Sequence, residues 1–287
     1  MIKLYEDRIK FIKSVQEAIY DDSYSGLSYD VVENLCRDFV TLFMAPYVNQ
    51  FIGSKHPHIT FSYAPPTERE LEGQEAVFYP SKNLIVMAIR AVDRKTRIST
   101  GRNSGSYFNA HLIFRAFESI AHEYEHFIQN MLVKMVKQGK EIPEEFKNWF
   151  ALDTQIVAND FLMKNNTEKE EAKQVQLFME LYPDIKEYVQ ALPVNGEMDK
   201  ILSIVDAKYY CRADEVDARF SAIKVIGFFE ESVHQVLGKD NSISFQLSEY
   251  KRHIMLNERR KLGVYEPVYQ GYLKIIKKLK NAGIFGE

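Results

Sequence analysis

The strongest constraint on the fold is a long stretch of apolar residues at helical spacing, followed by Gly139. Apolar side chains recur every three or four positions along it, which is the repeat of a helix that buries one face. Asn109 is expected to cap this helix at its start, and Gly139 is expected to end it. The apolar positions are Leu112, Ile113, Ala116, Phe117, Ile120, Ala121, Phe127, Ile128, Leu132 and Met135. The sequence therefore predicts a long central helix around which the other elements pack.

A His-Glu-x-x-His motif, formed by His122, Glu123 and His126, lies in the middle of this predicted helix. Positions four apart are one turn apart on the same helical face, so the two imidazoles can converge on one cation. Zinc accepts such ring nitrogens at about 2.0–2.1 Å. Glu123 projects about 100° round the helix from His122, so it can reach a water on the metal without being a ligand. The apolar flanks favour this metal site over a pair of surface histidines.

This motif predicts hydrolytic chemistry. Zinc lowers the pKa of a bound water toward about 7, and Glu123 can take the proton and return it to the leaving amine. We therefore expect a zinc metallopeptidase (a hydrolase) with Zn²⁺ as cofactor, Glu123 as general base and a protein or peptide as substrate. Two alternatives stay open: a catalytically silent binding or regulatory module of the same fold, and a zinc hydrolase that cleaves a non-peptide amide.

A catalytic zinc usually has three protein ligands, so the two histidines need a partner from elsewhere in the chain. The extended motif of the metzincins is missing, because Gln129 replaces its glycine and Leu132 its third histidine. A Glu-x-x-Ala sequence follows at Glu215 to Ala218, in a helix expected over residues 212–237.

With these two motifs the chain resembles the gluzincins, and more narrowly the small intracellular and phage-associated ImmA-like peptidases. The resemblance implies a zincin-like fold, Glu215 as third zinc ligand and a regulatory target inside the cell. Arg219 stands where larger gluzincins carry an Asp. Other ligands considered are the thiolate of Cys211 and the carboxylates of Asp214, Asp217, Glu144, Glu145 and Asp160.

Two further features would complete such a site. Negative charge builds on the carbonyl oxygen of the substrate and needs a donor, for which similar enzymes often use a Tyr or His. Tyr210 is the predicted donor, with Tyr209 as the alternative, because both precede the Glu215 helix. The strand predicted over Asn83–Ile89 is either a plain core strand or a strand that binds an extended substrate by β-addition.

The expected fold class is α+β and predominantly helical: a small sheet or hairpin packed on the central helix, with a C-terminal helical lobe. Sparse glycine (13) and proline (9) favour helices. The chain is predicted to be one two-lobed domain, with lobes at residues 1–140 and 141–287. Outside the central helix, we expect helices over 1–20, 29–51, 146–163, 212–237, 243–260 and 266–281, strands over 58–63, 75–79 and 83–89, and a mobile loop over 93–106.

Composition excludes several classes of protein. The net charge of −3 gives no general attraction to nucleic acid or to an anionic membrane, so neither is expected as a partner. Cys36 and Cys211 form no paired pattern, and the N-terminus lacks the apolar core of a signal peptide, which together indicate a cytoplasmic protein. A basic stretch from Lys251 to Lys280 is expected to be a solvated helix face; in the alternative of a silent binding module it would contact the partner. The oligomeric state is not predicted.

Overall fold

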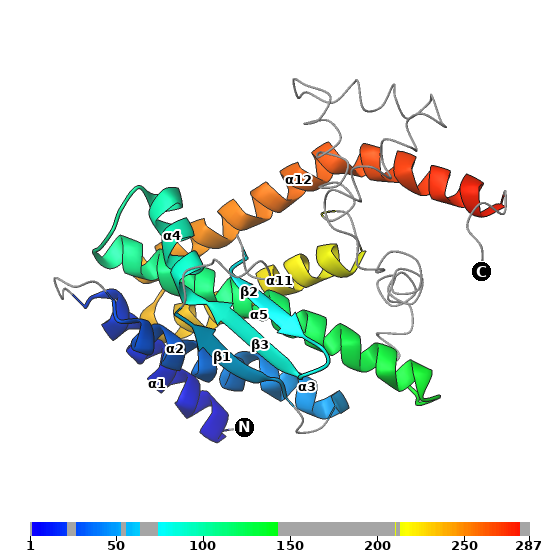
Figure 1. Ribbon diagram of the computed structural model, residues 1–287. Coiled ribbons are helices and arrows are strands. Elements are labelled where there is room, and N and C mark those ends of the chain that lie inside the picture. Colours follow the sequence, from blue (N-terminus) through cyan, green and yellow to red (C-terminus); the bar gives the residue numbers. More distant parts are fainter. Residues whose placement is uncertain are drawn as a thin grey trace. The chain divides into compact units, whose positions relative to one another are not determined.

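The computed structural model describes residues 2–21, 27–52, 56–63, 74–142, 210 and 213–281 (Figure 1). Two compact units divide the chain: the first contains Met1–Trp149 and Ala218–Met255, and the second contains Phe150–Asp217 and Leu256–Glu287. The described residues are mostly helical and include one small three-stranded sheet, which confirms the α+β, predominantly helical class. The predicted number of domains stays a prediction.

Helix α5 (Ser106–Lys137) is the central helix that the apolar spacing predicts. Its start differs from the prediction, because Asn109 lies inside the helix and does not cap it. The Asn109 side chain is buried, and its amide donates to the backbone carbonyls of Ile19 and Asp21, each at 3.3 Å. Its polar side chain therefore joins α5 to the end of the first helix. Gly139, with a φ of 67°, follows the end of α5 as predicted.

The sheet is formed by β1 (His58–Ser62), β2 (Ala76–Tyr79) and β3 (Leu84–Ala88), in the order β1-β3-β2. β1 pairs with β3 in parallel, and β2 pairs with β3 antiparallel as the predicted hairpin. Asn83 ends the turn of this hairpin with a φ of 50°, a conformation that asparagine tolerates well. Since β3 is paired on both sides, it is the plain core strand of the two alternatives for Asn83–Ile89, and β-addition along it is excluded; β2 is an edge strand of the described sheet.

Four segments form the N-terminal helices: α1 (Ile2–Ile19), α2 (Tyr29–Phe39), the π-helical segment η1 (Val40–Met44) and α3 (Ala45–Ile52). They confirm the helices expected over 1–20 and 29–51. The π-helical turn inside the second helix was not predicted. It lies beside Pro46, which lacks a backbone N–H and so interrupts the regular hydrogen bonding of the helix.

Arg8 supplies the donor that Pro46 removes. In a regular helix the N–H of residue 46 would bond to the carbonyl of Leu42, four residues earlier. The guanidinium of Arg8 donates to that carbonyl from Nε at 3.0 Å and from Nη2 at 2.8 Å. The same guanidinium lies 4.8 Å from the centre of the Phe43 ring, a cation–π distance. Arg8 therefore ties α1 to the irregular turn of the following helices.

Helix α4 (Ile89–Thr100) occupies most of the segment expected as a mobile loop over Asp93–Ser106, so that prediction is wrong. The loop prediction rested on the polar composition of this segment, but its apolar residues fall at helical spacing. Val92 and Thr96 are fully buried, and Asp93 accepts from Arg97 at 2.9 Å one turn later. Helix α4 ends where the backbone turns left-handed.

Helix α11 (Ala213–Leu237) confirms the helix expected over 212–237. Helix α12 (Ser242–Asn281) replaces the two helices expected over 243–260 and 266–281, because Pro267 lies inside one continuous helix. A proline removes one backbone hydrogen bond and bends a helix without always ending it. The helix predicted over 146–163 lies outside the described residues. Among the described helices, none combines the length and apolar character that crossing a membrane requires.

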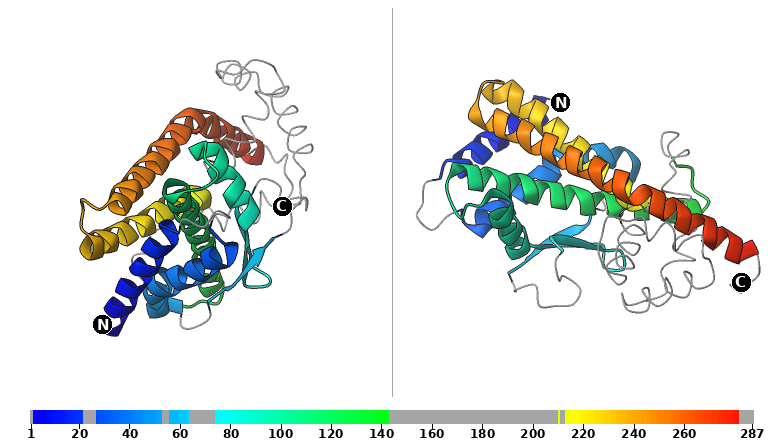
Figure 2. Two further views of the ribbon diagram at one scale, coloured as in Figure 1. Left: turned by 90° about the vertical axis from the view of Figure 1, so that its left-hand side faces the viewer. Right: turned by 90° about the horizontal axis from the view of Figure 1, so that it is seen from above.

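A cluster of five phenylalanines forms the centre of the first unit. Phe39 and Phe117 stack with ring centroids 4.2 Å apart, and Phe229 meets Phe117 edge-on at 5.5 Å. Phe11 and Phe43 complete the cluster, with centroids 6.0 and 5.4 Å from that of Phe229. Because these rings come from α1, α2, η1, α5 and α11, the cluster packs α11 against α5 (Figure 2). Helix α5 also contacts α4, β2 and β3.

Replacing Arg8 with Met is expected to lower the free energy of unfolding by about 1–3 kcal/mol, because the Leu42 carbonyl loses its donor. Denaturant titration measures this change. Lys10→Met is the control on the same helix: its side chain is 78% exposed, so we expect a change of no more than about 0.5 kcal/mol. In a Pro46→Ala background residue 46 regains an N–H, so the loss caused by Arg8→Met should shrink. An undiminished loss there would contradict this account of Arg8.

Candidate metal centre

The two histidines of the motif converge on one point beside α5. Their Nε2 atoms lie 3.1 Å apart, and their rings are perpendicular with centroids 4.7 Å apart. Two nitrogens bound to one tetrahedral zinc at 2.0–2.1 Å would lie roughly 3.3 Å from each other. Both His122 and His126 are half-buried, so the pair is open on one side and supported on the other. The spacing therefore fits a shared cation closely.

Gln129 holds His126 in the tautomer that metal binding needs. Its Oε1 accepts from Nδ1 of His126 at 2.8 Å, which puts the ring proton on Nδ1 and leaves the Nε2 lone pair for a cation. Gln129 is 1% exposed, so its amide has little freedom to turn away. In the sequence, Gln129 stands out only as a departure from the metzincin motif. The position three residues after His126, less than one turn away, was a signal that could have identified this role.

Glu215 completes the group that the resemblance implied. Ligand atoms of His122, His126 and Glu215 all lie within 4.8 Å of one another, and they form the one such group among the described histidines, cysteines and acids. Glu215 lies in the first turn of α11 and is 6% exposed. Ala218 and Ala222 follow on the same helix and are almost fully buried, so the side chains after Glu215 on this face are small. The Glu-x-x-Ala pattern thus combines a carboxylate with close packing.

The other candidates for the third ligand fall into two sets. Asp214 is buried at 4% exposure and Asp217 is half-buried, but neither belongs to the group that converges with the histidines. The remaining candidates lie outside the described residues: Cys211, Glu144, Glu145 and Asp160.

Glu123 lies beside this group but points to the sheet. Its Oε2 accepts from the backbone N–H of Phe78 on β2 at 2.7 Å, and its Oε1 is 3.9 Å from Nε2 of His122. The Glu123 side chain is 12% exposed. The carboxylate is therefore held by a backbone donor on one oxygen, while the other oxygen faces the histidine pair. This backbone contact has no signature in the sequence and was not predicted.

Tyr124 lies between Glu123 and His126 in the sequence, and its side chain points away from the histidine pair. Its hydroxyl donates to Nδ1 of His56 at 2.5 Å, and Nε2 of His56 then donates to Oδ1 of Asn49 at 2.9 Å. Burial raises the pKa of Tyr124 and lowers that of His56, so both stay neutral near pH 7. This chain of hydrogen bonds ties the middle of the motif to the segment that precedes β1.

Tyr210, the predicted transition-state donor, has its ring stacked on Tyr265 at 5.3 Å between centroids. The ammonium of Lys261 lies 5.0 Å from the same ring. These contacts fix the ring of Tyr210 but do not test the role expected for its hydroxyl, which stays a prediction. The alternative donor, Tyr209, lies outside the described residues.

Two imidazole nitrogens and one carboxylate oxygen are a donor set that zinc accepts, and such sets leave a fourth position open for water or substrate. No protein family, curated protein or solved structure matches this chain in the comparisons. The resemblance to gluzincins therefore stays an expectation from the two motifs. The convergence of His122, His126 and Glu215, with Glu123 beside them, is the observation that bears on function.

Gln129→Leu is expected to weaken zinc binding about 10- to 100-fold, because His126 loses the acceptor that fixes its tautomer. Competition with a chromogenic chelator measures the affinity. Gln129→Glu keeps an acceptor and should bind zinc at least as well as the unaltered protein. Gln138→Leu, at an exposed position just after α5, is the control and should leave the affinity unchanged. Equal affinities in the Leu variants at 129 and 138 would exclude the orienting role.

Proposed function

We propose that this chain is a zinc-dependent peptidase of gluzincin type, which hydrolyses a peptide bond beside α5. The observation that carries the proposal is the convergence of His122, His126 and Glu215, with Glu123 next to the group yet hydrogen-bonded elsewhere. The Glu123 carboxylate lies beside the three proposed metal ligands without being one of them, which is the position that a general base requires. A merely structural metal site is usually closed by a fourth protein ligand.

In the proposed reaction His122, His126 and Glu215 would hold Zn²⁺, which supplies a water of lowered pKa and polarises the carbonyl of the substrate. Glu123 accepts a proton from the attacking water through the oxygen that faces the histidines. The water oxygen bonds to the carbonyl carbon, the C–N bond breaks, and Glu123 passes the proton to the amine nitrogen. Phe78 N–H keeps the carboxylate in place throughout.

Strand β2 is where we propose that an extended substrate lies. Residues of an antiparallel pair alternate between facing the partner strand and facing away from it. Ala88 N–H donates to the carbonyl of Glu75 at 2.8 Å, so residue 75 faces β3 while Ala76 and Phe78 turn their backbone groups outward. The Phe78 N–H reaches Glu123, so this outward edge runs beside the base. Backbone pairing with Ala76 would therefore bring a peptide next to Glu123.

Glu123→Gln separates binding from hydrolysis. We expect the variant to retain bound zinc, because Glu123 is not in the ligand group, and to lose about 10²- to 10⁴-fold in the rate of peptide hydrolysis. Metal analysis of the purified protein and cleavage of a casein digest or peptide library measure the two properties. His122→Ala should lose both. Zinc-loaded, unaltered protein that cleaves no peptide would contradict the peptidase and favour the silent module, and cleavage of simple amides alone would favour the non-peptide hydrolase.

The third ligand is tested by Glu215→Ala, which we expect to lower zinc affinity by at least about tenfold, since the site loses its one anionic donor. Glu231→Ala removes an exposed carboxylate from the same helix and should have no effect. Asp214→Asn is the informative second variant, because Asp214 is the buried neighbour. Loss of affinity in Asp214→Asn with none in Glu215→Ala would reassign the ligand.

A further inference from the structure

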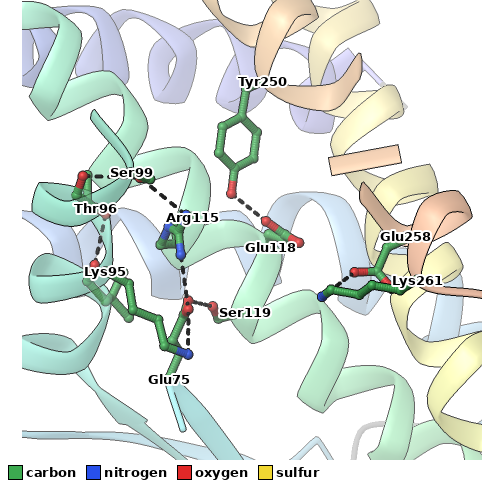
Figure 3. Close-up of polar contacts among 11 residues, drawn as sticks. Glu75, Lys95, Thr96, Ser99, Arg115, Glu118, Ser119, Tyr250, Glu258 and Lys261 are labelled. Atoms are coloured by element: carbon green, nitrogen blue, oxygen red, sulfur yellow. Dashed lines mark hydrogen bonds and ion pairs between the residues drawn. The ribbon is translucent and has the colours of Figure 1, made fainter. Parts of the chain in front are cut away.

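Glu75, the residue before β2, is the centre of a polar cluster that connects three elements (Figure 3). Its Oε1 pairs with the ammonium of Lys95 on α4 at 3.0 Å and with the guanidinium of Arg115 on α5 at 3.2 Å. Its Oε2 accepts from the hydroxyl of Ser119 at 2.7 Å. The Glu75 side chain is 16% exposed and that of Arg115 is 24% exposed, so this ion pair is less screened by solvent than a surface pair, whereas Lys95 is 41% exposed.

Two of the three partners of Glu75, Arg115 and Ser119, lie on the same stripe of α5 as the proposed base. Arg115, Ser119 and Glu123 are four residues apart from one to the next, which places them one above another on one face of the helix. Glu75 contacts the first two, and the N–H of Phe78 contacts the third. The short strand therefore follows the stripe for two turns of helix, held by a side chain at one end and a backbone group at the other.

The position of β2 along α5 needs these contacts, because β2 has only four residues and pairs with β3 alone among the described strands. Edge strands of this length fray easily. A slip of one residue along α5 would exchange the outward-facing Phe78 N–H for a residue that faces β3, and Glu123 would lose its donor. The ladder to β3 cannot prevent a movement of the whole hairpin relative to α5.

We propose that Glu75 is a positioning residue: it anchors the start of β2 to α4 and α5, and so fixes the strand edge that orients Glu123. The anchoring does not depend on any metal or activity. Its consequence for catalysis rests on the proposed function. Glu75 touches neither the ligand group nor the base, and it acts through Ala76 and Val77, the two residues of β2 that separate it from Phe78.

Glu230 offers a matched control within the first unit. It too accepts from a serine hydroxyl, that of Ser248 at 2.5 Å, and pairs with a lysine ammonium, that of Lys251. It is 6% exposed and joins α11 to α12, away from the strand. Removing either carboxylate leaves a half-buried serine and a lysine without this acceptor. A merely structural role for Glu75 would therefore make the two variants alike.

The test compares Glu75→Ala with Glu230→Ala by hydrogen–deuterium exchange of the zinc-loaded, full-length protein. We expect exchange in the peptide covering β2 to quicken at least about tenfold in Glu75→Ala and to stay unchanged in Glu230→Ala. Both variants should show a lower melting temperature. Ser119→Ala, which removes one of the three contacts, should give a smaller acceleration in β2, and Ser119→Thr should restore the original rate. Equal exchange of β2 in the two Glu variants would overturn the proposal.

Activity gives the second readout. With a peptide substrate, Glu75→Ala should lower kcat about tenfold or more while zinc affinity stays unchanged, because the base is displaced and the ligands are not. Glu230→Ala should leave kcat unchanged. If the unaltered protein hydrolyses nothing, the proposed function fails, yet the exchange of β2 still decides whether Glu75 anchors the strand. Rapid exchange of β2 with normal kcat would confirm the anchor and exclude its catalytic consequence.

Discussion

The contact between Phe117 and Phe229 is the interaction on which the candidate site depends. The motif of His122 and His126 is local, because one helix turn brings its two rings together, but Glu215 reaches it only if α11 packs on α5. The phenylalanine cluster supplies that packing. The two helices run antiparallel. Phe117 precedes the histidines along α5, whereas Phe229 follows Glu215 along α11. Burial of these apolar rings thus holds the Glu215 carboxylate beside the imidazoles of His122 and His126.

The sequence predicted what depends on neighbours along the chain. The central helix, the hairpin of the strands expected over 75–79 and 83–89, the helix over 212–237 and the convergence of the two histidines all follow from periodicity or turn chemistry. The errors share a different cause. Helix α4 was predicted as a loop because its surface is polar, and α12 was predicted as two helices, over 243–260 and 266–281, near Pro267, a residue of low helix propensity. In both places the rest of the helix outweighs the local preference.

The parts of the site that sequence could not supply are contacts of backbone or of distant side chains. Phe78 contributes an N–H, which every residue but proline has, so no pattern marks it. Glu75 and Arg115 are 40 residues apart, and their pairing depends on the placement of β2 along α5. Glu215 came from a resemblance that spans a gap of nearly ninety residues, and the geometry of the described residues brings it into the group. Spacing predicts ligands on one helix well and partners from other elements poorly.

The hydrogen bond from Tyr124 to His56 bears on how such a motif should be searched for. A pattern written as His-Glu-x-x-His leaves its two middle positions unrestricted, yet Tyr124 is fully buried here and Glu125 is 9% exposed. A side chain at either position must fit the interior, so most exchanges that the pattern permits would unfold this helix before they altered its chemistry. In this fold, packing restricts the two unspecified positions of the motif, and chemistry restricts its His and Glu positions. A chain can therefore match the pattern and still be unable to adopt the structure.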